Sequence, residues 1–231
     1  MNKKLNILTI VAFFSMCNSQ AQINTDSLKS NEKFGETHMY YTPTSKEALD
    51  LYTEGHDYFS KSEFRKSIAS YIKAIELEPK FVDAMDNLGN SYRYLGILDS
   101  AEFWYNKSIA MYPNGYIAHQ NLAIVYLSTS RLEKALNEYD TMILLDAENP
   151  EGYFGKANVY IQLKKGDEIV INAQKALTIY RKKHDPYEMD ALYLIGVGYY
   201  IQGDNKSAIK YLKKAKDMGM EIPEVLQKLF K

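Results

Sequence analysis

Apolar residues recur at intervals of three and four positions along most of this chain, which is the spacing of amphipathic helices. The stretch "MDNLGNSYRYLG" at residues 85–96 is representative. Met85, Leu88 and Tyr92 fall on one side of a helix, and most of the residues between them are polar. Short polar turns separate one helical stretch from the next. The pattern therefore predicts an all-α fold made of helix pairs.

The helical pattern also repeats along the chain with a period of 34 residues. Tyrosines mark the period at four positions, and each follows a small residue by three places: Tyr58, Tyr92, Tyr126 and Tyr160 after Gly55, Gly89, Ala123 and Ala157. A fifth unit carries Gly196 and Tyr199, and five extra residues precede it around "RKKHDPYE". Fixed periods of this length indicate a stack of similar helix pairs, because one pair alone cannot bury its apolar side.

The repeated unit resembles the tetratricopeptide repeat (TPR), which carries W-x2-L-G-x2-Y, then A-x3-F, then a proline over 34 residues. Gly89-x2-Tyr92, Ala101-x3-Tyr105 and Pro113 carry the resemblance in the clearest unit. The resemblance implies an α-solenoid of about five repeats with a C-terminal capping helix. It also implies a non-catalytic protein that binds protein or peptide partners.

The repeat boundaries give a complete domain prediction. The expected segments are a signal peptide (1–21), a flexible N-terminal arm (22–47) with local order around Met39-Tyr40-Tyr41, five repeats (48–81, 82–115, 116–149, a divergent 150–188 with the insertion, and 189–222) and a capping helix (223–231).

Glycines and polar residues predict details of the helix pairs. We expect Gly89 to be the small residue at a helix crossing, with Ala101 as its counterpart on the second helix. Gly96, matched by Gly203, is expected to end the first helix of its pair. Two start signals are expected as well, a capping box at Thr44-x-x-Glu47 and an N-cap at Asp185 followed by Pro186 as the first helical residue.

The first residues have the layout of a secretory signal peptide. Lys3 and Lys4 precede the apolar run "ILTIVAFF", which is too short to span a bilayer, and Ala21 ends a small-x-small cleavage pattern. We therefore expect export to the periplasm, the outer membrane or the medium, and a mature chain without a transmembrane segment. A second interpretation makes Cys17 the lipid-bearing first residue of a lipoprotein, although Met16 fits a lipobox poorly.

Charge and motif content restrict the function further. The formal net charge of −1 gives no basic surface for nucleic acid. The sequence holds no HExxH, G-x-S-x-G or phosphate-binding glycine loop, so we expect no enzyme activity, no cofactor and no metal. His119 occupies the position usually held by tryptophan in the repeat, and we expect it to be packed rather than to bind a ligand.

In TPR proteins the first helices line a face that takes a peptide or a partner helix. The residues expected on this face lie opposite the Leu-Gly pair. The candidate partner-binding residues are Tyr52, His56, Asn90, Arg93, Tyr94, Gln120, Phe154, Asn158, Tyr193 and Tyr200, with Phe59, Asp86, Ile124, Leu127, Ile161 and Val197 on the same face. The Lys, Asn and Arg clamp that holds acidic chaperone tails is matched only at Asn90, so such a tail is not the expected ligand.

Together these features predict a protein-binding scaffold of the bacterial cell envelope. Two alternatives remain open. The array either self-associates or braces an envelope assembly, or it serves as an accessory subunit or chaperone of an envelope enzyme.

Overall fold

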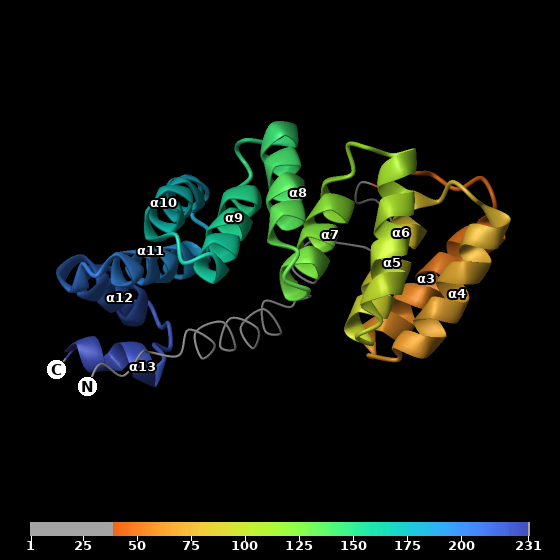
Figure 1. Ribbon diagram of the computed structural model, residues 1–231. Coiled ribbons are helices and arrows are strands. Elements are labelled where there is room, and N and C mark those ends of the chain that lie inside the picture. The colour runs from red at the N-terminus through yellow and green to blue at the C-terminus, as the bar shows by residue number, and fades with distance from the viewer. Residues whose placement is uncertain (1–38, 231) are drawn as a thin grey trace. The chain divides into compact units, whose positions relative to one another are not determined.

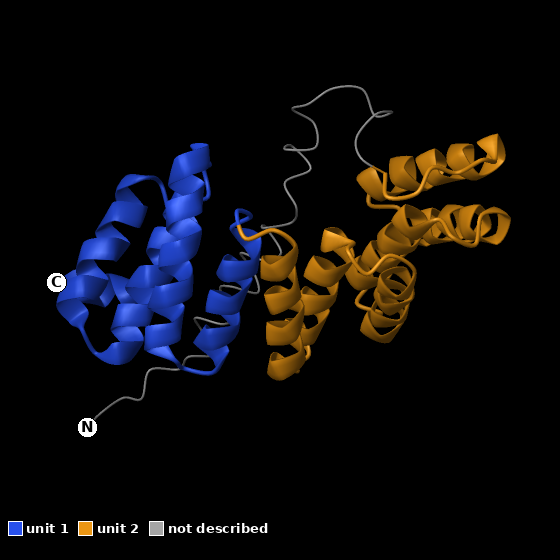
Figure 2. Ribbon diagram, turned by 90° about the horizontal axis from the view of Figure 1, so that it is seen from above, with its two compact units in different colours: residues 1–35, 148–231 blue, residues 36–147 orange. Residues whose placement is uncertain are grey.

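The computed structural model describes residues 39–230. The expected signal peptide, its alternative at Cys17 and most of the expected arm lie outside the described residues. Within residues 39–230 all regular structure is helical, which confirms the all-α prediction. The described chain forms two compact units, residues 39–147 (the N-terminal unit, orange in Figure 2) and residues 148–230 (the C-terminal unit, blue).

The N-terminal unit contains three helix pairs (Figure 1). Each helix packs against the one that follows it along the chain, and the first helices also contact each other, α3 with α5 and α5 with α7. The helices are α3 (Lys46–Ser60), α4 (Phe64–Leu77), α5 (Val82–Tyr94), α6 (Leu98–Met111), α7 (Tyr116–Ser128) and α8 (Leu132–Leu145).

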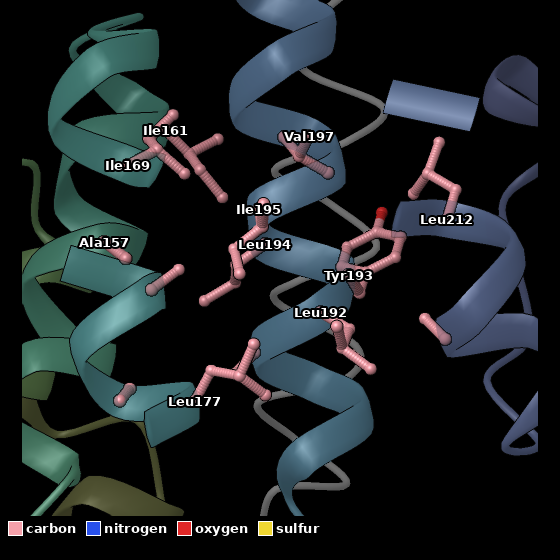
Figure 3. Packing of buried hydrophobic residues seen from close by; sticks show 14 of the residues in the cluster. Ala157, Ile161, Ile169, Leu177, Leu192, Tyr193, Leu194, Ile195, Val197 and Leu212 are labelled. Carbon is pink, nitrogen blue, oxygen red and sulfur yellow. The ribbon is translucent and has the colours of Figure 1, made fainter. Parts of the chain in front are cut away.

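The C-terminal unit contains two helix pairs and a short terminal segment. Its core gathers around one helix, α11, whose residues 191–198 are all buried (Figure 3). Leu226, in the terminal segment, is fully buried in the same core. The helices are α9 (Glu151–Gln162), α10 (Gly166–Lys183), α11 (Glu188–Gln202), α12 (Asn205–Asp217), α13 (Glu224–Gln227) and the 3-10 turn η1 (Lys228–Phe230).

The glycine of the repeat makes room for a ring rather than for a small side chain. A Cβ atom added to Gly89 would lie 2.6 Å from a ring carbon of Tyr105, and one added to Gly55 would lie 2.7 Å from the ring of Tyr71. Both tyrosines are fully buried. The expectation that Gly89 faces a small counterpart is therefore wrong in detail. The small residue lets the second-helix tyrosine of its own pair lie against the first helix.

The turn inside each helix pair has one residue in the left-handed region. Gly96 (φ 74°) and Gly203 (φ 84°) occupy it as predicted. In the other three pairs the same position is held by Ser62, Ser130 and Lys164, with φ between 56° and 60°. A non-glycine residue pays a steric cost of about 1–2 kcal/mol in this conformation. The turn geometry is thus imposed by packing of the pair, because it forms with or without glycine.

Two predicted helix starts are wrong by one or more residues. The N-cap of α3 is Ser45, whose side chain accepts from the Ala48 N–H, while Thr44 binds elsewhere. Helix α11 starts at Glu188, so Pro186 lies in the preceding turn. Asp185 accepts the Tyr187 N–H at 3.0 Å in that turn. At α3 a second capping residue, Ser45, takes the role expected of Thr44.

Within the described residues, no helix is long and apolar enough to cross a membrane.

Candidate functional site

The candidate residues of the N-terminal unit lie on its first helices, and most are only half-buried. Tyr52 is tied to its neighbours. Its hydroxyl accepts from the Asn87 amide at 3.0 Å, and its ring centre lies 4.9 Å from that of Phe81. Gln120 is half-buried on α7. His56 is half-buried on α3, and burial lowers its pKa. These side chains are both packed and accessible, as residues of a binding surface are.

Asn90, Arg93 and Tyr94 are more firmly built into the unit than the sequence suggests. Asn90 is 6% exposed and accepts the Tyr105 hydroxyl at 2.8 Å. The Arg93 guanidinium lies 4.7 Å from the Tyr94 ring centre. The Tyr94 ring in turn stacks on Phe64 at 5.2 Å. Asn90 thus supports the buried tyrosine of its own helix pair, and only Arg93 and Tyr94 leave part of their surface accessible.

In the C-terminal unit the candidate residues divide into accessible and buried ones. Phe154 and Tyr200 are half-buried. Asn158 is 8% exposed and donates its amide to the Phe154 carbonyl at 3.1 Å. Tyr193 is 3% exposed, because the neighbouring helices enclose α11. A partner-binding role for all ten candidates stays a prediction, and their accessibility favours Phe154 and Tyr200 in this unit.

Buried polar atoms without a hydrogen-bond partner in the protein occur on the first helices. They include Oδ1 of Asp86, Nε of Arg93 and Oδ1 of Asn158. Asp86 is 4% exposed, and burial raises its pKa to about 7, with Ser108 and His119 opposing the shift. Native proteins rarely leave such groups unpaired, because each costs roughly 1–3 kcal/mol.

His119 is packed, as the sequence predicts. It is 6% exposed, with Nδ1 2.6 Å from a carboxylate oxygen of Glu138 and Nε2 2.9 Å from the Pro113 carbonyl. Both neighbours are acceptors, so only the protonated ring donates to both. Burial acts to lower the pKa of His119, but these hydrogen bonds outweigh it and leave the pKa raised.

The segment before α3, residues 39–44, crosses the end of the N-terminal unit at which α5 begins (Figure 1). We call this segment the strap. The backbone N–H groups of Tyr40 and Tyr41 each donate to one carboxylate oxygen of Asp83, both at 3.0 Å. Asp83 lies in the first turn of α5. Burial raises the pKa of Asp83, and the two N–H groups partly offset this.

A second carboxylate, that of Glu78, holds the other half of the strap. The Tyr41 hydroxyl donates to Oε2 at 2.8 Å, and Oε1 accepts from the Thr44 hydroxyl at 2.7 Å and from the N–H groups of Thr44 and Ser45 at 2.9 Å each. These donors, the Thr44 hydroxyl first, lower the pKa of Glu78 to about 2. Glu78 therefore acts as an ionised anchor over the whole physiological range.

Apolar contacts accompany these hydrogen bonds. The Tyr40 ring stacks on Tyr112 at 4.9 Å, and Met39 and Tyr41 pack against the buried cluster that contains Phe81. A pocket of about 300 Å³ lies beside the strap. It is lined by Tyr40, Tyr41, Lys80, Val82, Met111 and Tyr112.

Glu78, Asp83 and Tyr112 were not predicted from the sequence, and the strap was expected to lie in a flexible arm with local order only around Met39-Tyr40-Tyr41. An acidic residue in the first turn of a helix is ordinary, because it complements the helix dipole. One signal was present: a carboxylate pair at the same two repeat positions recurs as Asp146 and Glu151 and as Asp185 and Asp190.

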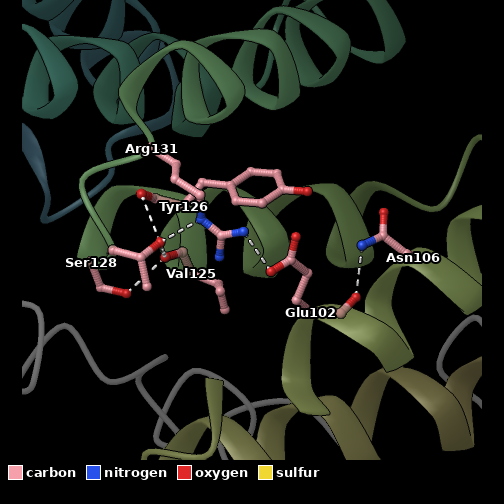
Figure 4. A network of polar contacts seen from close by, with 7 residues as sticks. Glu102, Asn106, Val125, Tyr126, Ser128 and Arg131 are labelled. Atoms are coloured by element: carbon pink, nitrogen blue, oxygen red, sulfur yellow. Dashed lines mark hydrogen bonds and ion pairs between the residues drawn. The ribbon is translucent and has the colours of Figure 1, made fainter. Parts of the chain in front are cut away.

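The polar contacts at the C-terminal end of α7 have a structural role (Figure 4). The Arg131 guanidinium lies 2.6 Å from Glu102 of α6 and donates to the Thr129 hydroxyl at 2.9 Å. It also lies 4.6 Å from the Tyr126 ring centre. This network joins the second and third helix pairs. In the described part of the chain, no cluster of three or more metal-ligating side chains occurs.

Stacked helix pairs with a left-handed turn in each pair define an α-helical repeat protein. Four sequence profiles described as TPR or tetratricopeptide repeat match the chain, at residues 55–96, 82–114, 104–137 and 172–221. The chain belongs to the tetratricopeptide repeat family. TPR proteins bind protein or peptide partners, and the fold supports a protein-interaction scaffold.

Curated relatives share the repeat over part of their length. Anaphase-promoting complex subunit 3 of Schizosaccharomyces pombe is 28% identical over 154 residues, which are 67% of this chain and 22% of that protein. The CTR9 homolog of Arabidopsis thaliana is 28% identical over 65% of this chain and 14% of its own length. The chain therefore spans about a fifth or less of these relatives.

Solved structures with the same fold match more of the chain. MamA from Desulfovibrio magneticus RS-1 gives a TM-score of 0.68 at 15% identity, covering 76% of this chain and 97% of that one. YrrB, described as a TPR protein with an unusual peptide-binding site, gives 0.63 at 21% identity, covering 80% and 92%. At these identities the likeness establishes the solenoid fold, and confirms the predicted architecture.

Proposed function

We propose that this protein is a non-catalytic scaffold of the bacterial cell envelope that binds an extended peptide or a partner helix on its first helices. One observation carries the proposal. Tyr52, Arg93 and Gln120 in the N-terminal unit, and Phe154 and Tyr200 in the C-terminal unit, lie on the first helices of their pairs and keep part of their surface accessible. Side chains of this kind supply the contacts that bind an extended peptide or a helix.

Three of these accessible side chains are aromatic, which suits the same ligand. They are Tyr52, Phe154 and Tyr200. Aromatic side chains supply most of the binding energy in many peptide interfaces. The envelope location rests on the signal-peptide pattern ending at Ala21, and N-terminal sequencing of the protein from cell fractions tests it.

Site-specific photocrosslinking tests the binding face. A photoreactive phenylalanine analogue replaces Gln120 or Tyr200 on the first helices, or Phe103 on α6 as the control. Phe103 is 59% exposed, so it reports contacts of the second helices. We expect crosslinked partners from Gln120 and Tyr200 and none from Phe103. Crosslinks from Phe103 alone would contradict the proposal.

Self-association is the second candidate, because several large apolar side chains are exposed on second helices. Phe103 is 59% exposed on α6 and Leu144 is 87% exposed on α8. Light scattering of the purified protein separates the two. A stable oligomer that Leu144→Ser dissociates would favour the self-associating scaffold over the peptide-binding one.

A further inference from the structure

We propose that the surface around Glu78 and Asp83 is a binding site for an extended peptide with two consecutive aromatic residues and a hydroxyl residue three positions after the second of them, and that the protein's own strap is its resident ligand. The inference rests on the proposed function and adds to it the sequence class of the ligand and a mode of regulation. A partner gains this site only by displacing Met39–Thr44.

The strap is held in the way that an extended peptide ligand is held. Asp83 accepts two consecutive backbone N–H groups, those of Tyr40 and Tyr41, through its two oxygens. Main-chain bonds of this kind give affinity for any extended segment, while side-chain contacts give specificity. Any peptide other than one with proline at these positions offers the same two donors.

Specificity comes from contacts on both sides of Asp83. The Tyr112 ring recognises the first aromatic residue, because Tyr40 stacks on it, and Glu78 recognises the second, because it accepts the Tyr41 hydroxyl. The other Glu78 oxygen accepts the hydroxyl of Thr44, which lies three residues after Tyr41. The preferred ligand therefore has the form aromatic, tyrosine, two residues, threonine or serine.

The site also offers space that the strap does not fill. The pocket of about 300 Å³ beside Tyr40 extends to Met111 and Lys80. This unused space lets a ligand with an additional apolar side chain bind more tightly than the strap. Displacement is then favourable.

The test is binding of a labelled peptide to the full-length protein. The probe is the acetylated peptide MYYTPTS with a C-terminal fluorophore, measured by fluorescence anisotropy. The proteins are wild type and the double variant Tyr40→Ala, Tyr41→Ala, which weakens the strap and leaves the site intact. We expect the variant to bind the peptide at least tenfold more tightly than wild type, because the strap no longer competes in cis.

Two further variants show whether the peptide occupies the strap's position. In the double-variant background, Asp83→Asn replaces one acceptor oxygen by an NH2 group and should weaken peptide binding at least tenfold. Asp99→Asn is the matched control, since Asp99 is an exposed carboxylate in the first turn of α6. It should leave binding unchanged. Circular dichroism melts confirm that each variant is folded.

Equal peptide affinity in wild type and double variant, no binding to the double variant, or equal effects of the two asparagine substitutions would each overturn the inference. None of these outcomes depends on the photocrosslinks from Gln120 and Tyr200. Partners captured there with no peptide binding at Asp83 would refute the inference alone. Peptide binding without any captured partner would count against the proposed function instead.

Discussion

Helices α5 and α11 begin with the same pair of acidic positions and use them differently. At the start of α5, Glu78 and Asp83 accept the strap's hydrogen bonds. At the start of α11, Asp185 accepts an N–H group of its own turn, and burial raises the pKa of Asp190 to about 6. The acidic pair therefore binds another segment only where hydrogen-bond donors reach both carboxylates. Where they do not, the buried carboxylate lowers the stability of the fold.

The two helices differ along their length as well. Helix α11 is buried from residue 191 to 198 and forms the centre of the C-terminal core. Helix α5 keeps Asp83, Asn87 and Arg93 half-buried. The repeat motif thus fixes how a helix pair packs, while the residues outside the motif decide whether its first helix presents a surface to a partner.

The largest expected effect on stability concerns the small-residue position that α5 and α11 share, Gly89 and Gly196. Gly89→Leu and Gly196→Leu should each lower the free energy of unfolding by about 3 kcal/mol, the upper end of the usual cost of overpacking. A Cβ atom at Gly196 would lie 2.7 Å from Leu212, much as one at Gly89 meets Tyr105. Urea unfolding measures both. A loss at only one of the glycines would show that the two helix pairs are not packed alike.

Replacing the second acidic residue of each pair by asparagine should change the free energy of unfolding in opposite directions at α5 and α11. Asp190→Asn should raise the free energy of unfolding at pH 8 by about 1–2 kcal/mol, because it removes a charge that burial disfavours. Asp83→Asn should lower it by about 1 kcal/mol, because the loss of a strap hydrogen bond outweighs the removal of a charge whose pKa burial also raises. Chemical denaturation of the two variants measures the difference. Effects of the same sign would contradict the comparison.

The left-handed turn gives a smaller effect that applies to both units. Lys164→Gly and Ser62→Gly should stabilise by about 1 kcal/mol, and Gly203→Ala should destabilise by about the same amount. No atom lies within 4 Å of a Cβ added at Gly203, so the stability lost in Gly203→Ala reports backbone strain alone. Thermal unfolding measures these changes. Stabilisation by Gly203→Ala would show that the turn does not need the left-handed conformation.

Glu78 and Asp190 should respond to pH in opposite directions. The pKa of Glu78 is lowered, so its contribution to strap binding is present above about pH 4.5, the ordinary value, and is lost as the pH falls toward 2. The pKa of Asp190 is raised, so its cost is present above about pH 6 and disappears as the pH falls toward 3.8. Proteolysis at the strap should therefore increase in acid, while the C-terminal unit should gain stability between pH 7 and 5. Pepsin cleavage at pH 2 and 4, together with denaturant unfolding at pH 7 and 5, tests both directions.

The fold could be predicted from the sequence because the motif residues repeat at a fixed period. The candidate face was harder to predict, since equivalent positions differ in surroundings: Gln120 is accessible, and Tyr193 is enclosed by neighbouring helices. Local order around Met39-Tyr40-Tyr41 was expected, but the contacts of the strap could not be predicted. Its partners, Glu78 and Asp83, look like ordinary residues at helix ends, and their contacts join segments 33 to 43 residues apart in the sequence.

Amide hydrogen exchange at Tyr40 and Tyr41 tests the central claim most directly, because exchange reports whether these two N–H groups are hydrogen-bonded in solution. In the full-length protein we predict exchange at least tenfold slower than in the free peptide MYYTPTS. Asp83→Asn should remove this protection and Asp99→Asn should preserve it. Exchange at the free-peptide rate in wild type would contradict the account, since the surface would then hold no resident ligand.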